Sequence, residues 1–190
     1  MREIRLPASE EAMRALQVGD EVEITGVMIT ARDAAHKYLV EEPADEMRDL
    51  LRGSMIYHCG PVVKEENGDY SFVAAGPTTS IREEPYEAAV IEKFGVRGII
   101  GKGGMGKKTL EACRAHGCVY LHAIGGLAVI LAQSVKKVAG VHKLEEFGTP
   151  EAMWVIEVEK FPAVVTMDAH GHSLHEEIEA ASKEQMEKLI

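Results

Sequence analysis

Cysteines and long apolar runs are both scarce in this sequence. No apolar run approaches the roughly 20 residues that span a bilayer, and the N-terminus lacks the basic-then-apolar layout of a signal peptide. The three cysteines, Cys59, Cys113 and Cys118, are odd in number and irregularly spaced, which excludes a disulfide framework and favours reduced thiols. Since no CxxC pair is present, they are weak ligands for zinc or iron–sulfur, and we expect buried free thiols in a cytoplasmic protein.

Positive charge is also in short supply. Lysine and arginine total 21 against 31 aspartates and glutamates, which gives a net charge of -10. Such a surface repels nucleic acid and anionic lipid unless positive charge gathers locally, so the composition argues against non-specific nucleic-acid binding. A chain of 190 residues with 46% hydrophobic content buries one sizeable core, and we expect a single compact domain over residues 1–190.

The first third of the chain predicts strands and helices in turn. Ser9 is placed to cap a short helix, and residues 21–30 alternate charged and apolar side chains around Gly26, as a half-buried strand with a bulge does. A helix follows from Asp33, with its carboxylate near the helix start. Arg32 therefore lies at a strand-to-helix junction.

Residues 43–52 predict a second helix that Gly53 closes, and residues 54–59 predict a buried strand. A polar turn at 64–69 precedes a strand at 70–75. We expect the strands at 54–59 and 70–75 to pair as a hairpin.

The rest of the chain alternates strand and helix patterns, which indicates a mixed α/β fold with a parallel layer. Helices are predicted at 85–94, 107–116 and 124–134, and strands at 96–100, 119–122 and 138–141. Residues 153–158 and 163–167 predict an antiparallel pair of strands around Pro162. The tail, residues 170–190, is predicted as an amphipathic helix or a frayed end.

A glycine-rich loop at 101–107 imitates a phosphate-binding loop between a strand and a helix. That motif requires a hydroxyl directly after its lysine to hold magnesium. Here Lys108 takes that place and Thr109 comes one residue late, which turns its side chain by about 100° on a helix. Two interpretations stay open, an anion site formed by the loop, the helix N-terminus and Lys102, or a tight turn with solvated lysines.

A second loop, residues 76–82, carries three consecutive hydroxyls at Thr78, Thr79 and Ser80, followed by Arg82. Helix capping ahead of Pro85 is the plain explanation of these hydroxyls. The alternative is that both loops, which lie one strand-and-helix unit apart, grip a small multiply charged anion.

Four ordered motifs give the chain a family resemblance. They are Thr30-Ala31-Arg32-Asp33-Ala34-Ala35-His36-Lys37, Tyr57-His58-Cys59-Gly60-Pro61, Gly76-Pro77-Thr78-Thr79-Ser80-Ile81-Arg82 and Gly101-Lys102-Gly103-Gly104-Met105. From about residue 21 to about residue 168, the chain resembles the C-terminal or β part of the iron–sulfur-dependent (class I) fumarase family, which includes tartrate dehydratase. The resemblance implies a swivelling β/β/α domain that docks on a separate α part.

The resemblance also implies a cofactor, a partner and a reaction. The α part of the family holds a [4Fe–4S] cluster through three cysteines, and the cysteines of this chain lie outside that motif, so the chain resembles the β subunit of an α2β2 enzyme. The implied reaction is the reversible hydration of fumarate to (S)-malate, with dehydration of L-tartrate as the alternative. Without its partner, a β subunit of this kind is able to self-associate.

By the same resemblance, particular residues take roles toward a small dicarboxylate. Arg32, Arg82 and Lys102 bind its carboxylates, Thr79 donates it a hydrogen bond, and Thr78 takes part in proton abstraction with the help of an aspartate from the partner. Fixed cations suit this reaction because negative charge develops on a carboxylate as the adjacent carbon loses its proton. A nucleotide-binding switch on the 101–107 loop and a non-catalytic assembly subunit are the rivals from other classes.

Five histidines receive separate interpretations. His36 is either close behind the site or on the surface, and His58 is a satisfied core histidine. His170, His172 and His175 have spacings that suit a transition metal, but a solvated tail is the simpler explanation.

Overall fold

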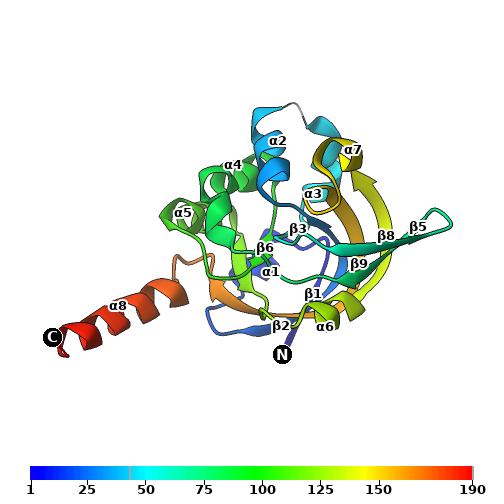
Figure 1. Cartoon of the computed structure of the whole chain (residues 1–190). Coiled ribbons are helices and arrows are strands. Elements are labelled where there is room, and N and C mark those ends of the chain that lie inside the picture. Colours follow the sequence, from blue (N-terminus) through cyan, green and yellow to red (C-terminus); the bar gives the residue numbers. More distant parts are fainter. Residues whose placement is uncertain (43, 190) are drawn as a thin grey trace.

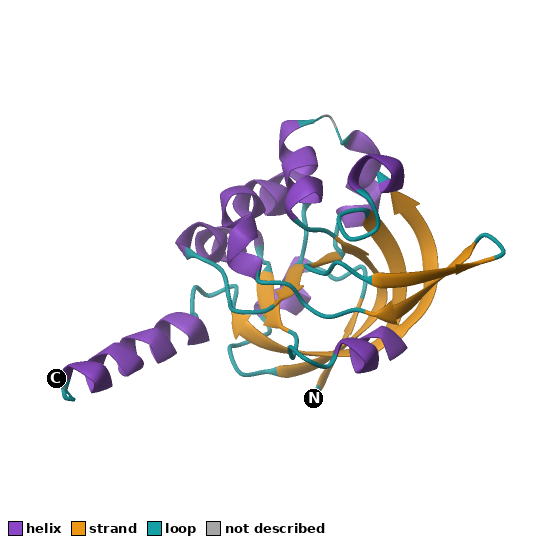
Figure 2. Cartoon of the chain, in the orientation of Figure 1, coloured by secondary structure: helices purple, strands orange, loops and turns teal. Residues whose placement is uncertain are grey.

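A curved seven-stranded sheet forms the centre of the computed structural model, which describes residues 1–42 and 44–189 (Figure 1, Figure 2). The strands of this sheet are β1 (Arg2–Arg5), β2 (Glu21–Thr30), β3 (Met55–Tyr57), β6 (Gly98–Gly101), β7 (Val119–His122), β8 (Val135–His142) and β9 (Met153–Met167). The helices are α1 (Glu10–Arg14), α2 (Asp33–Glu41), α3 (Arg48–Leu51), α4 (Glu84–Phe94), α5 (Lys107–His116), α6 (Ala128–Gln133), α7 (Leu144–Phe147) and α8 (Leu174–Glu187), with 3-10 turns η1 (Asp45–Met47) and η2 (Ser80–Glu83). The predicted mixed α/β fold is confirmed. Of the helices described, none combines the length and the apolar character needed to cross a bilayer.

The sheet curls because β9 pairs with β7 and β8 and also with β2. The strand order is β1-β2-β3-β6-β7-β9-β8, and β1, β2, β3, β6 and β7 run parallel. β9 runs antiparallel to both β7 and β2, which bends the sheet into a partial barrel, seen as the orange arc of Figure 2. The carboxyl ends of β2, β3 and β6 consequently meet at one edge of the sheet.

Two apolar cores lie on opposite faces of this sheet. Successive side chains of a strand point to opposite faces, so Tyr57 and Ile100 pack inside the barrel whereas Ile56 and Ile99 pack outward. The outer core is completed by α2, α3, α4 and α5, which cover that face (Figure 1). Strands buried on both faces have continuous apolar sequences, and this is why their positions were predictable.

The predicted hairpin between residues 54–59 and 70–75 is wrong. β3 instead joins the large sheet between β2 and β6. The hairpin forms between β4 (Val62–Glu66) and β5 (Asp69–Ala74), and Asn67 and Gly68 have φ values of 55° and 88° at its turn. Two consecutive residues with positive φ fit a type I′ turn, so the supposed polar turn is largely strand.

The predicted pair of strands around Pro162 is also wrong. β9 is continuous from Met153 to Met167 and pairs with β2 on both sides of Pro162. The backbone bends locally at Lys160, where φ is 51°, and the sequence pattern at this point had suggested a turn between two strands.

Several local predictions are confirmed. The Ser9 side chain accepts a hydrogen bond from the amide of Ala12, and β2 shifts register between Ile24 and Gly26. α5 and β7 have the predicted bounds. Pro43 and Ile190, at the ends of two predicted helices, lie outside the described residues. α8 has no buried residue and projects from the body toward the C-terminus (Figure 1).

Candidate functional site

The predicted site residues lie along the edge where the parallel strands end. Arg32 follows β2 as the N-cap of α2, and Lys102 directly follows β6. Thr78 and Thr79 lie in the loop between β5 and η2, and Arg82 lies within η2. The crossover topology therefore gathers three separate chain segments at this edge.

Main-chain hydrogen bonds join the two loops that the sequence singled out. The amide of Lys102 donates to the carbonyl of Thr78 at 3.2 Å, and the amide of Ser80 donates to the carbonyl of Lys102 at 3.0 Å. The amide of Thr78 in turn donates to the carbonyl of His58 at 2.8 Å. The threonine loop is thus bonded as a short extra strand beside the end of β6, with Thr79 opposite Lys102.

Arg32 is held against the loop that follows β3. Its side chain is only 21% exposed and its Nε lies 3.3 Å from a carboxylate oxygen of Glu151. A Cβ at Gly60 would lie 2.5 Å from the guanidinium, so the glycine leaves the space that the arginine needs. Glu151 also accepts the amide of Ala34 at 3.1 Å, which fixes the arginine to the first turn of α2.

Arg82 connects the second loop to the same helix. Its guanidinium forms an ion pair with Asp33, the residue after Arg32, and the Arg82 side chain is 55% exposed. Unlike these two arginines, Lys102 makes no ion pair with any residue that the structure describes. Three fixed cations thus belong to segments that contact one another directly.

The threonine hydroxyls do not cap a helix. Thr79 precedes η2 without a capping hydrogen bond from its side chain. The Oγ1 of Thr78 is buried and has no hydrogen-bond partner within residues 1–42 and 44–189. The helix-capping explanation of these hydroxyls is therefore wrong. Buried hydroxyls normally have a hydrogen-bond partner, so the hydroxyl of Thr78 is available to bond a ligand.

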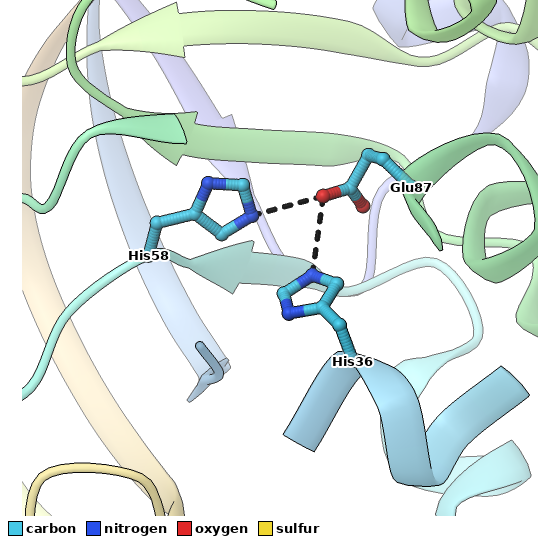
Figure 3. A group of neighbouring side chains, drawn as sticks. All are labelled: His36, His58 and Glu87. Carbon is cyan, nitrogen blue, oxygen red and sulfur yellow. Dashed lines mark hydrogen bonds and ion pairs between the residues drawn. The ribbon is translucent and has the colours of Figure 1, made fainter. Parts of the chain in front are cut away.

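A buried cluster lies directly behind this edge and contains His36, His58 and Glu87 (Figure 3). The Nε2 of His58 lies 2.9 Å from Oε2 of Glu87, and the Nε2 of His36 lies 3.1 Å from the same oxygen as an ion pair that is not well aligned for hydrogen bonding. On its other side, the Nδ1 of His36 lies 2.9 Å from the carbonyl oxygen of Arg32. The Nδ1 of His58 lies 2.9 Å from Oγ of Ser80, which also accepts a hydrogen bond from the hydroxyl of Tyr120.

The charges in this cluster are set by burial and by the close carboxylate. Burial opposes a charge on His36, but the close carboxylate of Glu87 and the charge of Glu83 raise the pKa of His36 to about 9. Burial likewise opposes the Glu87 carboxylate, but His36 and His58 lower its pKa to about 2. Burial lowers the pKa of His58. The cluster is therefore an imidazolium, a carboxylate and a neutral imidazole, with both nitrogens of His36 facing acceptors.

The sequence analysis correctly placed His58 in the core. It left His36 either close behind the site or on the surface, and the structure shows that His36 is buried. It missed Glu87 altogether. A signal was present, because Glu87 shares a helical face with the buried residues Val90, Ile91 and Phe94 at spacings of three, four and seven. A carboxylate on an apolar face requires a buried partner.

The glycine loop does not form a phosphate site. The carboxylate of Glu84 accepts the amides of Gly106, Lys108 and Thr109 at 2.7, 3.0 and 3.3 Å, and the hydroxyl of Thr109 at 2.7 Å. A Cβ at Gly106 would lie 2.6 Å from this carboxylate. The helix N-terminus that would bind an anion is thus already occupied by one from the chain itself. This occupancy argues against the nucleotide-switch alternative.

Nor do the cysteines fit an iron–sulfur cluster. All three are buried and free. Cys59 lies in the core inside the barrel, whereas Cys113 and Cys118 lie in the core on the opposite face of the sheet. Three thiolates of one cluster converge on the same iron–sulfur core, which this separation excludes.

The tail histidines also have separate partners. The Nδ1 of His172 lies 2.9 Å from the buried carboxylate of Asp168, the Nε2 of His170 lies 2.9 Å from the carbonyl oxygen of Arg14, and the Nε2 of His175 lies 3.0 Å from Oγ1 of Thr166. Among the described residues, the one group of donors close enough together to suggest a metal is His36, His58 and Glu87.

None of the five cavities described within residues 1–42 and 44–189 is lined by Arg32, Thr78, Thr79, Arg82 or Lys102.

Comparisons with known proteins agree with the resemblance seen in the sequence. A family model described as the fumarase C-terminus matches residues 1–178. A putative fumarate hydratase class I of Geobacillus stearothermophilus is 54% identical over 98% of this chain, which spans only 36% of that relative. A putative L(+)-tartrate dehydratase subunit beta of Methanocaldococcus jannaschii is 41% identical over 96% of this chain and 95% of its own length. The L(+)-tartrate dehydratase subunit beta of Escherichia coli K12 is 36% identical over 97% of this chain and 91% of its own length.

Proposed function

Because this chain belongs to the fumarase C-terminus family, we propose that it is the β subunit of a hydro-lyase that adds water to fumarate and forms (S)-malate. One observation carries the proposal. The main-chain bonds between Thr78 and Lys102 and the ion pair of Arg82 with Asp33 bring three cations and two threonines to one edge of the sheet. Such a group of side chains suits a small dicarboxylate.

Arg32, Arg82 and Lys102 would bind the two carboxylates of the substrate. Dehydration removes a proton from the carbon beside a carboxylate, and the electron pair left behind spreads onto that carboxylate. Fixed cations stabilise this charge as it develops. Guanidinium groups bind carboxylates through two parallel hydrogen bonds, so Arg32 and Arg82 also orient the substrate.

Thr78 would carry the proton in this reaction, and Thr79 would donate a hydrogen bond to the substrate. In the dehydration direction, the Oγ1 of Thr78 accepts the proton from carbon while its own proton passes to an assisting base. A threonine hydroxyl is a poor base without such assistance. We assign the assisting carboxylate to the partner, and the unpartnered buried Oγ1 supports the role given to Thr78.

A cluster-bearing α subunit would complete the enzyme, with α2β2 as the proposed assembly. We place the [4Fe–4S] cluster in that subunit, where it supplies a Lewis acid for the departing hydroxyl. The position of the partner is supported by apolar side chains beside the site, since Ile124, Val129 and Ile130 are 57%, 60% and 54% exposed. The segment that carries them is bonded to the threonine loop through the amide of Ala75 and the carbonyl of Ala128. Alone, the chain would self-associate through the same surface.

L-tartrate is the second candidate substrate. This chain covers 95% and 91% of the length of two relatives named as L(+)-tartrate dehydratase β subunits. Fumarate is preferred because the relative at 54% identity is named a fumarate hydratase.

Reconstitution tests the function. The chain is combined anaerobically with an α subunit from the same source, and the loss of fumarate absorbance is followed beside the dehydration of L-tartrate. We expect turnover of fumarate only when both chains are present. Turnover of L-tartrate without turnover of fumarate would make L-tartrate the substrate. Full turnover by the Arg82→Ala and Lys102→Ala complexes would refute the roles assigned to these two residues.

A further inference from the structure

The cluster of His36, His58 and Glu87 has no role in the reaction proposed above, yet all three side chains are completely buried. Taking charged groups out of water is costly, and replacing a buried ion pair by apolar residues is often neutral or stabilising. Stability alone therefore does not explain why a buried imidazolium and a buried carboxylate are present here. Their geometry indicates what else they do.

The two outer ends of the cluster bind the two segments that carry the site. On one side, His36 donates from Nδ1 to the carbonyl of Arg32. On the other, His58 accepts the hydroxyl of Ser80, and its own carbonyl accepts the amide of Thr78. Glu87, in α4, joins both histidines through a single oxygen, Oε2 (Figure 3).

We propose that His36, Glu87 and His58 are positioning residues that hold the main chain of Arg32 and the Thr78–Ser80 loop at a fixed separation. Arg32 and Thr78 then face the same ligand without any direct bond between their side chains. The proposal rests on the proposed function only for the identity of that ligand. The mechanical link itself is a property of this chain.

A metal ion between the three side chains is the competing explanation. Zinc binds imidazole nitrogen and carboxylate oxygen at about 2.0–2.2 Å in a tetrahedron, which places neighbouring ligand atoms about 3.4 Å apart. The two nitrogen–oxygen distances here, 2.9 and 3.1 Å, are shorter than that. They fit direct contact between an imidazole and a carboxylate.

The Glu87→Gln substitution breaks the link with little change of volume. A neutral carbonyl oxygen in place of Oε2 is a weaker acceptor for both histidines than the carboxylate, and the amide puts two buried donors where Oε1 has no partner among the described residues. Glu92→Gln is the matched control, because Glu92 lies exposed on the same helix. If Glu87→Gln fails to fold, Ser80→Ala cuts the same link at the hydroxyl instead.

Amide hydrogen exchange by NMR on the full chain is the test. We expect exchange at Thr78, Ser80 and Lys102 to become at least ten-fold faster in Glu87→Gln, while amides of the β8–β9 ladder keep their rates. We also expect the imidazole nitrogen signals of His36 to change from doubly protonated to neutral. Equal acceleration throughout the chain, no acceleration at the three amides, or one tightly bound metal ion per native chain would overturn the proposal.

The assembled complex then connects the link to turnover. Glu87→Gln should lower kcat/KM for fumarate at least ten-fold, and Glu92→Gln should leave it unchanged. A native complex without hydratase activity would refute the proposed function but would leave the exchange result standing. Local acceleration of exchange with unchanged kcat/KM would refute the positioning role alone.

Discussion

The first turn of α5 depends on one carboxylate from the neighbouring helix, and its removal gives a prediction with a magnitude. Glu84 accepts hydrogen bonds from three main-chain amides and from the hydroxyl of Thr109. A hydrogen bond to a charged group contributes about 1.5–3 kcal/mol, and bonds that share one acceptor do not add fully. We expect Glu84→Ala to lower the free energy of unfolding by about 3 kcal/mol, which shifts Tm by about 6–12 °C in a chain of this size.

Urea unfolding followed by circular dichroism measures this loss. Glu92→Ala is the control, because Glu92 lies on the exposed face of the same helix, where substitutions usually change stability by less than about 0.5 kcal/mol. Glu84→Gln should fall between the two, since it keeps one acceptor oxygen without the charge. A Glu84→Ala chain as stable as the Glu92→Ala chain would refute the conclusion that Glu84 occupies the helix N-terminus.

Three further predictions follow from the same contacts. Although burial opposes its charge, Glu87 and Glu83 raise the pKa of His36 from 6.5 to about 9, so its stabilising effect is complete below pH 6.5 and is lost as pH rises through 9. Urea unfolding should show a fall of about 3 kcal/mol between those limits, and a flat profile would contradict the charged state given to His36. Arg82→Ala should cost less than about 1 kcal/mol of stability, because its ion pair is exposed, yet raise KM for the dicarboxylate in the complex; an unchanged KM would remove Arg82 from the site. Calorimetric titration of ATP with magnesium should give no binding in the micromolar range, and micromolar binding that Lys107→Ala abolishes would reverse the account of the glycine loop.

Local elements were predictable wherever the residues that decide them are neighbours in sequence. The apolar residues of β6 and β7 are short runs bounded by glycines, and the helix between them has a regular apolar face. β1 was missed because three of its four residues are charged. Its strand conformation comes from pairing with β2.

Pairing partners were less predictable, because they depend on contacts between distant segments. Strands 54–59 and 70–75 are close in sequence, yet β3 pairs with β6 and β5 pairs with β4. A single positive φ at Lys160 keeps β9 continuous where Pro162 suggested a break. Nothing in the local sequence distinguishes that bend from a turn.

In the candidate site, too, residues within short sequence motifs were predictable and contacts between distant segments were not. Its cations and threonines were proposed through the four motifs, and two of the loops were expected to lie together because they are one strand-and-helix unit apart. Glu84 and Glu87 were missed, because the partners of their carboxylates are distant in sequence. Both carboxylates bond to segments 22 or more residues away, at Gly106 and at His36 and His58.

Turnover by a pair of Thr78 variants tests the central claim most directly. In the reconstituted complex, Thr78→Ser keeps the hydroxyl and Thr78→Ala removes it, and neither breaks a side-chain hydrogen bond within the described residues. We expect both variants to keep the stability of the native chain, Thr78→Ser to retain most of kcat, and Thr78→Ala to lose at least about 100-fold in kcat, the usual scale for a group that transfers a proton. Equal kcat for the Thr78→Ala and native complexes would contradict the claim that this edge carries the chemistry.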